Sequence, residues 1–478
     1  MNILYVSPEI TPFAKTGGLA DVSQALPIAI KKLGHDIRTI MPKYLNIAGQ
    51  DHTMERVKSF TVQMHNGLHG AVLWHAENDS VPTYFVENDG YFNREEFYGQ
   101  DGRDYPDNLE RFVFFCKAAL ESCKAVSFFP DVIHCNDWQT ASLPAMLKAT
   151  YSAYRQDPFF SPVPKLIFTI HNISYQGRFP EDHWPILSLP RSYYDHDFEF
   201  FGQINLTKSA IHLADAVTTV SETYAQEIQT TDFGFGLQDD LQSVKENLFG
   251  ILNGVDYQQW NPGTDPYTYG IHYSADDLSG KRRIKSKLRE AYGLPDRDDV
   301  PLIGMTARFV EQKGIDLITR CADKMLWLDT QIIVLGSGDQ RYHDFFEWLR
   351  RSYPDQVGIY IGFNNELAHR IEAGADIFLM PSLFEPCGLN QIYSLKYGTL
   401  PVVRLTGGLA DTIEDGVNGF IFYDFDENSF FDAVQRAIDI YRNHPDRWRQ
   451  MMITAMGQDH SWETSAKKYL GIYRRDVT

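Results

Sequence analysis

The hexapeptide Thr-Gly-Gly-Leu-Ala-Asp occurs twice in this chain, at Thr16–Asp21 and again at Thr406–Asp411. Both copies follow an apolar run and precede residues with helical periodicity. A glycine pair between a strand and a helix lets the backbone approach a bound group closely, and the start of the helix offers free N–H groups and the positive end of its dipole to an anion. Because one copy lies in each half of the chain, the repeat predicts two α/β domains of the nucleotide-binding type.

The two copies differ in the residue that precedes them. Lys15 precedes the first copy, and its ammonium group can act as a point charge for a phosphate or for an anionic leaving group. Leu405 precedes the second copy, so the two turns are expected to have different roles. Gly-Gly turns also serve as simple strand-to-helix connections, which is the structural alternative for either copy taken alone.

The length and charge of the chain limit its architecture and its partners. At 478 residues it exceeds what one hydrophobic core usually supports, which predicts two domains of roughly 200 residues or more. The formal net charge is −19, and no basic cluster offsets it. The chain is therefore expected to bind neither nucleic acid nor an anionic membrane surface. An anionic substrate would need a site that is locally basic.

Cysteine usage and hydropathy predict a soluble cytoplasmic protein. The five cysteines have no metal-ligand spacing, and their odd number argues against a disulfide framework, as expected in a reducing compartment. The first apolar strand pattern begins directly after Met1, so no signal or transit peptide is expected. No apolar run approaches the roughly 20 residues that a membrane span needs.

Short apolar runs alternate with amphipathic segments along the chain, which is the pattern of repeated βαβ units. Apolar residues at helical spacing follow the first glycine pair, and Gly34 closes that segment at the position favoured for a helix C-terminus. Each half is thus predicted to contain a doubly wound parallel sheet. The predicted strands are Ile3–Val6, Val132–Cys135, Leu166–Ile170, Ala216–Val220, Leu302–Ala307, Ile332–Leu335, Ile359–Ile361, Ile377–Met380 and Leu400–Val403.

The domain boundary is predicted where turn-forming residues dominate, within residues 250–262. The predicted N-terminal domain spans residues 1–250, and the predicted C-terminal domain spans residues 251–460. Residues 461–478 carry apolar side chains at helical spacing and are predicted to form a closing helix. That helix either bridges the domains by packing back on the N-terminal one or is an ordinary terminal helix.

Ligands of such sheets bind beyond the carboxyl ends of the strands, so functional side chains are expected in the loops there. The loop after Ile377–Met380 contains Glu385, whose carboxylate can converge with the N–H groups of Cys387 and Gly388 on several hydroxyls of a sugar. The structural alternative for Glu385 is a carboxylate that faces a helix dipole. Arg308 and Lys313 follow the strand Leu302–Ala307 and can clamp a diphosphate, unless they are solvated surface charges.

In the first half, polar and aromatic side chains follow two buried strands. Asp137 and Trp138 come directly after one strand, and His171 and Asn172 come after the next. These residues place a carboxylate, a flat ring that can stack on a sugar, and an imidazole at one rim of the sheet. His171 has a structural alternative as a hydrogen-bond partner of nearby backbone.

Taken together, these segments identify the chain as resembling bacterial glycogen synthases and plant starch synthases over essentially its whole length. The resemblance rests on an ordered set of motifs: Lys15–Val22, Asn136–Trp138, Thr169–Asn172, Ile251–Asp256, Arg308–Gly314, Glu385–Gln391 and Thr406–Thr412. It implies a GT-B type glycosyltransferase fold, in which two Rossmann-like doubly wound domains face each other across a deep cleft. The N-terminal domain is then the acceptor side, and the C-terminal domain holds most of the nucleotide sugar.

The resemblance also implies roles for individual residues. Arg308 and Lys313 bind the diphosphate, Glu385 holds the transferred glucose, and Asp137 lies near the reacting centre. Phe363 matches an aromatic ring over the adenine, although a core position is the alternative. The implied catalytic residues are Lys15, Asp137, His171, Arg308, Lys313 and Glu385. The implied substrate-binding residues are Gly17, Gly18, Asp21, Trp138, Asn253, Phe363, Cys387, Gly388, Leu389, Thr406, Gly407 and Gly408.

The implied reaction transfers glucose from ADP-glucose to the non-reducing end of an α-1,4-glucan, glycogen or a malto-oligosaccharide. It retains the anomeric configuration and needs no metal or other cofactor. In an oxocarbenium-like transition state, cationic side chains and the glycine turns would stabilise the departing diphosphate. We favour same-face attack directed by the phosphate over a covalent intermediate, which requires a carboxylate close beneath the anomeric carbon.

Two other functions fit the same motifs. A related nucleotide-sugar transferase that makes a small disaccharide shares the fold and the phosphate clamp. A non-catalytic glucan-binding scaffold is disfavoured because Lys15, Arg308, Lys313 and Glu385 are all present together. The choice between ADP-glucose and UDP-glucose, the primer length, the oligomeric state and any allosteric control stay open at this level.

Overall fold

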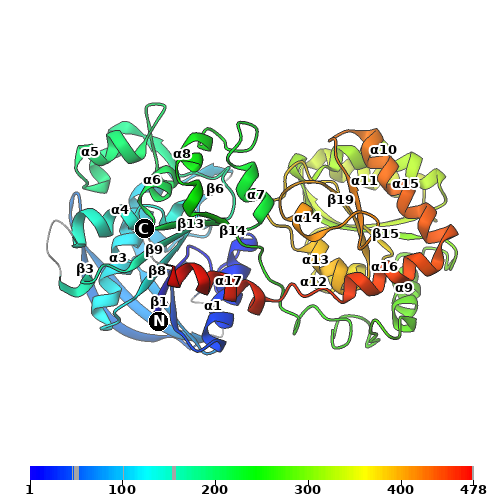
Figure 1. Cartoon of the computed structure of the whole chain (residues 1–478), viewed down its shortest axis with the longest axis horizontal. Helices are drawn as coiled ribbons and strands as arrows, with labels where there is room; N and C mark the ends of the chain where they lie inside the picture. The colour runs from blue at the N-terminus through cyan, green and yellow to red at the C-terminus, as the bar shows by residue number, and fades with distance from the viewer. Residues whose placement is uncertain (46, 48–52, 101, 153–157, 476–478) are drawn as a thin grey trace. The chain divides into compact units, whose positions relative to one another are not determined.

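The computed structural model describes residues 1–45, 47, 53–100, 102–152 and 158–475. It divides into two compact units (Figure 1). Unit 1 comprises Met1–Gly254 together with Trp462–Thr478, and unit 2 comprises Val255–Ser461. Each unit is an α/β structure with its own sheet, as the repeat of apolar runs predicts.

Unit 1 is built around a sheet that has nine strands among the described residues. The strand order is β14-β13-β9-β8-β1-β2-β5-β4-β3, and the seven strands from β14 to β5 run parallel. Their apolar runs are buried on both faces, as is typical of parallel strands covered by helices. The strands are β1 (Asn2–Val6), β2 (Asp36–Pro42), β3 (Glu55–Met64), β4 (Gly67–Asn78), β5 (Val81–Glu87), β8 (Val132–Asn136), β9 (Lys165–Ile170), β13 (Ala216–Thr219) and β14 (Leu248–Gly250).

The strand order of unit 1 reverses between β1 and β8. The chain runs outward from β1 to β2 and β5, and then returns to place β8 on the other side of β1. Such a reversal opens a crevice outside the carboxyl ends of the two strands, where open α/β sheets bind ligands. The helices of unit 1 are α1 (Gly18–Lys32), α2 (Asp89–Phe92), α3 (Asn108–Ala125), α4 (Leu143–Met146), α5 (Arg191–Tyr193), α6 (Leu206–Leu213), α7 (Glu222–Glu227), α8 (Gln238–Ser243) and α17 (Trp462–Arg474).

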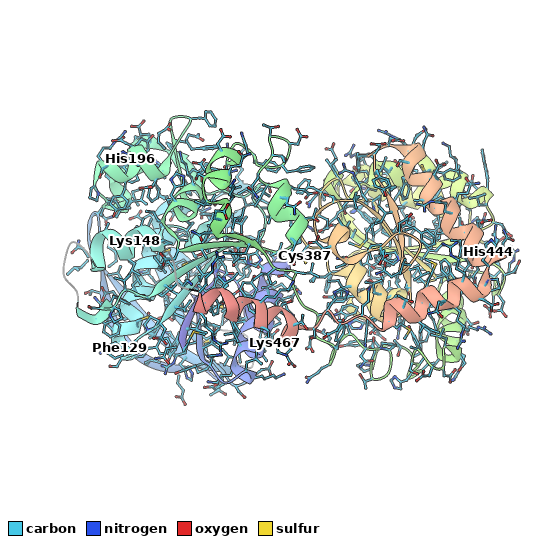
Figure 2. The ribbon with its side chains drawn as sticks, viewed as in Figure 1. Phe129, Lys148, His196, Cys387, His444 and Lys467 are labelled. Carbon is cyan, nitrogen blue, oxygen red and sulfur yellow. The ribbon has the colours of Figure 1, made fainter. Side chains whose placement is uncertain are left out.

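The last helix, α17, belongs to unit 1 although it follows all of unit 2 in the sequence. It packs against α1, beside which it lies in Figure 1. Its buried face joins Ile3 and Tyr5 of β1 in one hydrophobic cluster, and the Tyr473 hydroxyl lies 2.7 Å from Nδ1 of the buried His134 in β8. Its outer face is charged: Lys467, labelled in Figure 2, pairs with Glu463 at 2.6 Å.

Unit 2 contains a parallel sheet with six strands among the described residues, in the order β17-β16-β15-β18-β19-β20. The order reverses between β15 and β18, which places the ligand crevice beyond the ends of these two strands. The strands are β15 (Leu302–Phe309), β16 (Gln331–Gly338), β17 (Val357–Ile361), β18 (Ile377–Met380), β19 (Leu400–Arg404) and β20 (Phe420–Phe422). The helices are α9 (Ser279–Tyr292), α10 (Ile315–Trp327), α11 (Gln340–Ser352), α12 (Asn365–Gly374), α13 (Asn390–Lys396), α14 (Gly407–Thr412), α15 (Glu427–Asn443) and α16 (Pro445–Met456).

The basic segment that opens unit 2 is structural. It forms α9, where Lys281 is buried and donates to the Ala373 carbonyl at 3.0 Å, and Lys285 pairs with Asp376 at 2.6 Å. Burial lowers the pKa of Lys281 to about 7. These two lysines therefore hold the helix against the sheet, and neither ammonium group is directed to a ligand.

The fold contains every predicted strand and adds strands that were not predicted: β2, β5 and β14 in unit 1, β20 in unit 2, and an antiparallel edge of unit 1. Each predicted strand is present within about three residues at either end. The helix after the first glycine pair ends at Lys32, and Gly34 follows it with φ 88°. The antiparallel strands β3 and β4 extend the sheet of unit 1 beyond β5. All five cysteines lie in described residues, are buried and form no disulfide. None of the described helices has the length and hydropathy that a membrane crossing requires.

Candidate active site

The first glycine turn follows β1 and opens α1, whose first residue is Gly18. Lys15 is half exposed and its Nζ lies 2.7 Å from Oδ1 of Asp21, in the first turn of the helix. A Cβ placed on Gly17 or on Gly18 would meet no atom within 4 Å. Open space therefore surrounds this turn within the chain, as a turn that admits a ligand requires.

Glu9 fixes the first glycine turn, and sequence analysis missed it. Its carboxylate is buried and accepts hydrogen bonds from the backbone N–H of Thr16, from the Thr16 hydroxyl at 2.6 Å and from the Tyr98 hydroxyl at 2.5 Å. Burial, followed by the charge of Glu9, raises the pKa of the Tyr98 hydroxyl well above its usual value. Glu9 could not have been found from spacing, because Tyr98 is 89 positions away in the chain.

Asp137 directly follows β8 and lies at the crevice of unit 1. Its backbone has φ 55°, a left-handed conformation that is uncommon for a residue other than glycine. The backbone N–H of His171, which follows the neighbouring strand β9, donates to Oδ1 of Asp137 at 2.7 Å. Burial raises the pKa of the Asp137 carboxyl to about 7; the backbone N–H donor lowers it, and the charge of Glu9 adds to the rise.

The His171 ring lies beside Asp137, and its partner is a side chain. Nε2 of His171 lies 3.0 Å from Oδ1 of Asn136. Burial lowers the pKa of the ring to about 3, so the imidazole is neutral at physiological pH. The structural alternative for His171 was a hydrogen bond to nearby backbone. The ring instead bonds to the side chain of Asn136. Sequence analysis therefore placed His171 and Asp137 together correctly but missed Asn136 as the residue that holds the ring.

Trp138 and Asn253 are the other predicted residues of unit 1. The Trp138 ring packs edge-on against Phe112 at 5.1 Å, and a Cβ on Gly177 would lie 2.7 Å from it. Protein atoms thus already cover part of the ring that was expected to stack on a sugar. Asn253 is 6% exposed, and its Oδ1 accepts no hydrogen bond from any described residue.

In unit 2, Lys313 and Glu385 are paired at the crevice between β15 and β18. Nζ of Lys313 lies 2.5 Å from Oε2 of Glu385, and the Ser382 hydroxyl donates to the same oxygen at 3.0 Å. The Glu385 side chain is 8% exposed and that of Lys313 is 20% exposed. Glu385 precedes the first residue of α13, Asn390, by five positions. The Glu385 carboxylate therefore contacts a cation and a hydroxyl. It does not face the start of helix α13, which was the structural alternative.

The second glycine turn uses its glycines differently from the first. Gly407 has φ 43°, and a Cβ there would lie 1.9 Å from the Glu385 carbonyl oxygen; a Cβ on Gly408 would lie 2.0 Å from the Cys387 carbonyl oxygen. The Gly408 N–H donates to the Glu385 carbonyl at 3.1 Å. This turn is therefore packed tightly against the loop that carries Glu385 and fixes its backbone. The expectation that the two copies differ in role has this physical basis.

The remaining predicted residues of unit 2 surround the same strand ends. Arg308, near the end of β15, has an exposed side chain with no hydrogen bond or ion pair to any described residue. Phe363, two residues after β17, is 87% exposed, so it is not a core residue. Thr406 is buried and precedes α14. Gly388 has φ 70°, where a side chain would be strained.

Cys387 and Leu389 complete the loop after β18. Cys387, labelled in Figure 2, is buried, and its carbonyl accepts a hydrogen bond from the Gln391 side chain at 3.0 Å. Leu389 is partly buried at the start of α13. Sequence analysis missed Arg404, whose guanidinium donates to the Leu383 carbonyl and fixes the other end of this loop.

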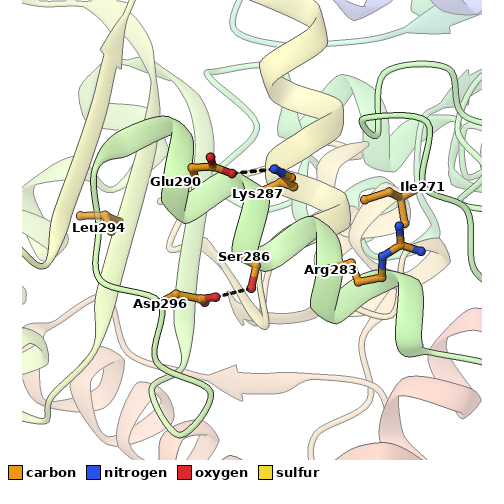
Figure 3. Close-up of a pocket in the computed structure, with 7 residues that line it drawn as sticks. All are labelled: Ile271, Arg283, Ser286, Lys287, Glu290, Leu294 and Asp296. Atoms are coloured by element: carbon orange, nitrogen blue, oxygen red, sulfur yellow. Dashed lines mark hydrogen bonds and ion pairs between the residues drawn. The ribbon is translucent and has the colours of Figure 1, made fainter.

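A separate hollow lies on α9 and the segment after it (Figure 3). Its volume is about 520 Å³, and none of the predicted site residues lines it. Two contacts join its polar side chains: Lys287 pairs with Glu290 at 2.7 Å, and the Ser286 hydroxyl donates to Asp296 at 2.6 Å. Across the described ranges, no group of His, Cys, Asp and Glu side chains is arranged to hold a metal ion.

Comparison with known families gives one match within each of the two units. Residues 2–243 match the family described as "Starch synthase catalytic domain", and residues 286–452 match the family described as "Glycosyl transferases group 1". The two Rossmann-like sheets, with their glycine turns and charged strand ends, are thus those of a glycosyltransferase.

Full-length relatives define the class more closely. The chain is 42% identical to a glycogen synthase of Syntrophotalea carbinolica over 100% of this chain and 99% of that relative. It is 43% identical to glycogen synthase 2 of Geobacter sulfurreducens, over 99% and 98% of the two chains. The solved catalytic domain of starch synthase IV from Arabidopsis thaliana, bound to ADP and acarbose, superposes with a TM-score of 0.89 at 33% identity, and covers 100% of this chain and 99% of that chain. The chain belongs to the glycogen and starch synthase family of glycosyltransferases, which confirms the resemblance and the GT-B type fold class predicted from its motifs.

Proposed function

We propose that this glycosyltransferase moves glucose from ADP-glucose to the non-reducing end of an α-1,4-glucan, releases ADP and retains the anomeric configuration. The observation that carries the proposal is the partly buried pair of Lys313 and Glu385, which puts a cation and a carboxylate at the carboxyl ends of β15 and β18. The cation suits a diphosphate, and the carboxylate accepts hydrogen bonds from sugar hydroxyls. Support for the donor and the acceptor comes from the names of the glycogen synthase relatives and from the ADP in the starch synthase structure.

The diphosphate leaving group is the centre of the proposed chemistry. Arg308 has an exposed guanidinium near the end of β15, and Lys313 follows a few residues later. Both charges stabilise a diphosphate more strongly as the glycosidic bond breaks and negative charge grows on it. Lys15, in unit 1, is proposed to add a third positive charge in the reacting complex. Thr406, Gly407 and Gly408 are proposed to bind the distal phosphate.

The transferred glucose is proposed to lie against Glu385, Cys387, Gly388 and Leu389, with His171 and Asn253 near its hydroxyls. Asp137 lies 2.7 Å from the backbone N–H of His171, so a group beside His171 is also close to this carboxyl. Because burial raises the Asp137 pKa to about 7, the carboxyl can be protonated or ionised near neutral pH. We favour same-face attack by the acceptor hydroxyl, with the departing diphosphate accepting its proton.

We further propose that no metal ion or other cofactor takes part and that the enzyme acts in the cytoplasm. In this proposal the positive charge needed by the leaving group comes from Arg308, Lys313 and Lys15. Transfer should therefore be unchanged after exhaustive treatment with a chelator. Adding Mg²⁺ back should not raise the rate.

One assay tests the reaction class and the donor together. Purified protein is incubated with ADP-glucose or UDP-glucose and with glycogen, maltotriose or glucose as acceptor, and nucleotide release and product length are measured. We expect faster ADP release with glycogen present and chains that grow by single glucose units. Transfer to glucose alone would instead indicate a disaccharide-forming enzyme. Glycogen binding without nucleotide release would indicate a scaffold.

A further inference from the structure

The amide of Asn136 has its orientation fixed by three neighbours. Its Nδ2 donates to the Val6 carbonyl at 3.0 Å, and a carbonyl can only accept. Its Oδ1 therefore faces the other two partners, the Tyr5 hydroxyl and Nε2 of His171, each at 3.0 Å. Asn136 is fully buried, so water does not compete for these bonds. The reversed amide would place two acceptor oxygens against each other.

This orientation determines which nitrogen of His171 carries the proton. Because Oδ1 of Asn136 can only accept, Nε2 of His171 must donate, and the neutral ring then has its lone pair on Nδ1. The structure gives Nδ1 of His171 no hydrogen-bond partner among the described residues. The ring thus has one nitrogen held by the protein and one left as an acceptor.

His134, two residues before Asn136 on the same strand, shows the contrasting arrangement. Its Nδ1 lies 2.7 Å from the Tyr473 hydroxyl, and its Nε2 lies 2.6 Å from the Thr169 hydroxyl. Both nitrogens of His134 are therefore used inside the fold. His171 differs from such a purely structural histidine, because its Nδ1 has no partner among the described residues.

We propose that Asn136 is a positioning residue that holds His171 in its Nε2–H form and so presents Nδ1 as a permanent acceptor for one hydroxyl of the transferred glucose. The proposal rests on the proposed function only in naming glucose as the ligand. Tyr5 is a second donor to the same oxygen, so removing its hydroxyl leaves the hydrogen bond that His171 donates to Asn136 in place. Because Nδ1 can only accept, it requires an O–H donor on the sugar. A deoxy analogue lacks that donor, so the enzyme should discriminate against it.

The proton position can be measured without any substrate. The full chain, labelled with ¹⁵N at its histidine rings, is compared as wild type, Asn136→Ala, Asn136→Asp and Tyr5→Phe, with His171→Ala to assign the signals. We expect His171 to show a protonated Nε2 and an unprotonated Nδ1 in the wild type and in Tyr5→Phe. Asn136→Ala should show a mixture of the two neutral forms. Asn136→Asp with its carboxyl protonated has an O–H that can donate to the Val6 carbonyl and an oxygen that accepts from Nε2, so it should restore the wild-type form at mildly acidic pH.

The consequence for recognition is tested with ADP-glucose analogues that lack one sugar hydroxyl each. The wild type should discriminate against one analogue by about tenfold or more in kcat/KM. His171→Ala and Asn136→Ala should both lose the discrimination at that same position, and Tyr5→Phe should keep it. A folding defect alone would lower kcat/KM equally for all donors. It would leave the ratio of kcat/KM between ADP-glucose and the analogue unchanged.

Two results would overturn the inference while leaving the proposed function intact. One is a wild-type enzyme that transfers glucose but carries the His171 proton on Nδ1. The other is an Asn136→Ala enzyme that retains both the Nε2–H form and the full discrimination of the wild type. If the Ala variant does not fold, the Asp variant decides the question: loss of the Nε2–H form there refutes the role of the Asn136 oxygen. Failure of the wild type to release ADP would count against the proposed function, and the ring measurement would still stand.

Discussion

Lys313 and Glu385 are 72 positions apart in the sequence, yet Nζ of one lies 2.5 Å from Oε2 of the other. They meet because β15 and β18 are neighbours in the sheet, and each residue lies in the loop that follows its strand. The two were assigned to different parts of the donor, the diphosphate and the glucose. Under the proposed function, a diphosphate would have to compete with Glu385 for the Lys313 ammonium group.

This competition predicts opposite effects of Glu385→Gln on binding and on transfer. Without the carboxylate, Lys313 is free to bind the diphosphate. The variant should therefore bind ADP at least as tightly as the wild type does, which calorimetry measures. Glucose transfer should fall at least tenfold, about 1.4 kcal/mol of transition-state stabilisation. Glu366→Gln, an exposed carboxylate paired with Arg370 in the same unit, is the control. Near wild-type turnover in a folded Glu385→Gln enzyme would remove Glu385 from the active site.

Phe363 should affect donor affinity without affecting stability. Its ring is 87% exposed, so Phe363→Ala removes little packing and should leave the melting temperature unchanged. If the ring stacks on adenine, the variant should lose about 1 to 3 kcal/mol of donor binding, seen as a raised KM for ADP-glucose. The preference for ADP-glucose over UDP-glucose should shrink. Phe201→Ala, 82% exposed in unit 1, is the matched control and should change neither quantity.

The two glycine turns should respond in opposite ways to alanine. A Cβ on Gly17 meets no atom within 4 Å and its φ of −156° suits any residue, so Gly17→Ala should change stability by less than about 1 kcal/mol. A Cβ on Gly408 would overlap the Cys387 carbonyl at 2.0 Å, so Gly408→Ala should lower the melting temperature of unit 2 markedly. Donor KM, in contrast, should rise for Gly17→Ala. Equal destabilisation by the two variants would contradict this difference.

Asp137 should make the stability of unit 1 depend on pH. Burial raises its pKa from the ordinary value of 3.8 to about 7, so the folded state holds the proton more tightly than the unfolded state. Ionising Asp137 does not destabilise the protein below pH 3.8. The destabilisation grows as the pH rises from 3.8 to about 7, and it is constant above about 7. Asp137→Asn cannot ionise, so its melting temperature relative to the wild type should increase as the pH rises from 4 to about 8.

The loss of one acceptor oxygen in Asp137→Asn adds an offset that does not change with pH, so the slope is the test. Thermal melts of both proteins across this range measure it. Asp232→Asn, which changes an exposed carboxylate of unit 1, should show no such slope. A flat difference for Asp137→Asn would mean that the carboxyl ionises as it does in water.

The sequence predicted the sheets better than the contacts between their ends. Parallel strands buried on both faces are continuous apolar runs, and Ile377–Met380 was predicted with the bounds that β18 has. The edge strand β3 has mostly exposed residues and no such run, which explains why it was missed. At the sites, the residue types that follow each strand were visible, but the partners were not. Glu9 and Tyr98, or Asn136 and His171, come together only through strand order and register, which one sequence does not encode locally.

Because α17 completes unit 1, the two units differ in when they can finish folding on the ribosome. All residues of unit 2 have been made before Trp462 emerges, so unit 2 can close its core while the chain is still growing. Unit 1, though begun first, must wait with Ile3 and Tyr5 uncovered until the last helix arrives. The nascent N-terminal half is therefore the part of this enzyme that chaperones would meet, and a message cut short just before Trp462 would yield a finished unit 2 joined to an unfinished unit 1.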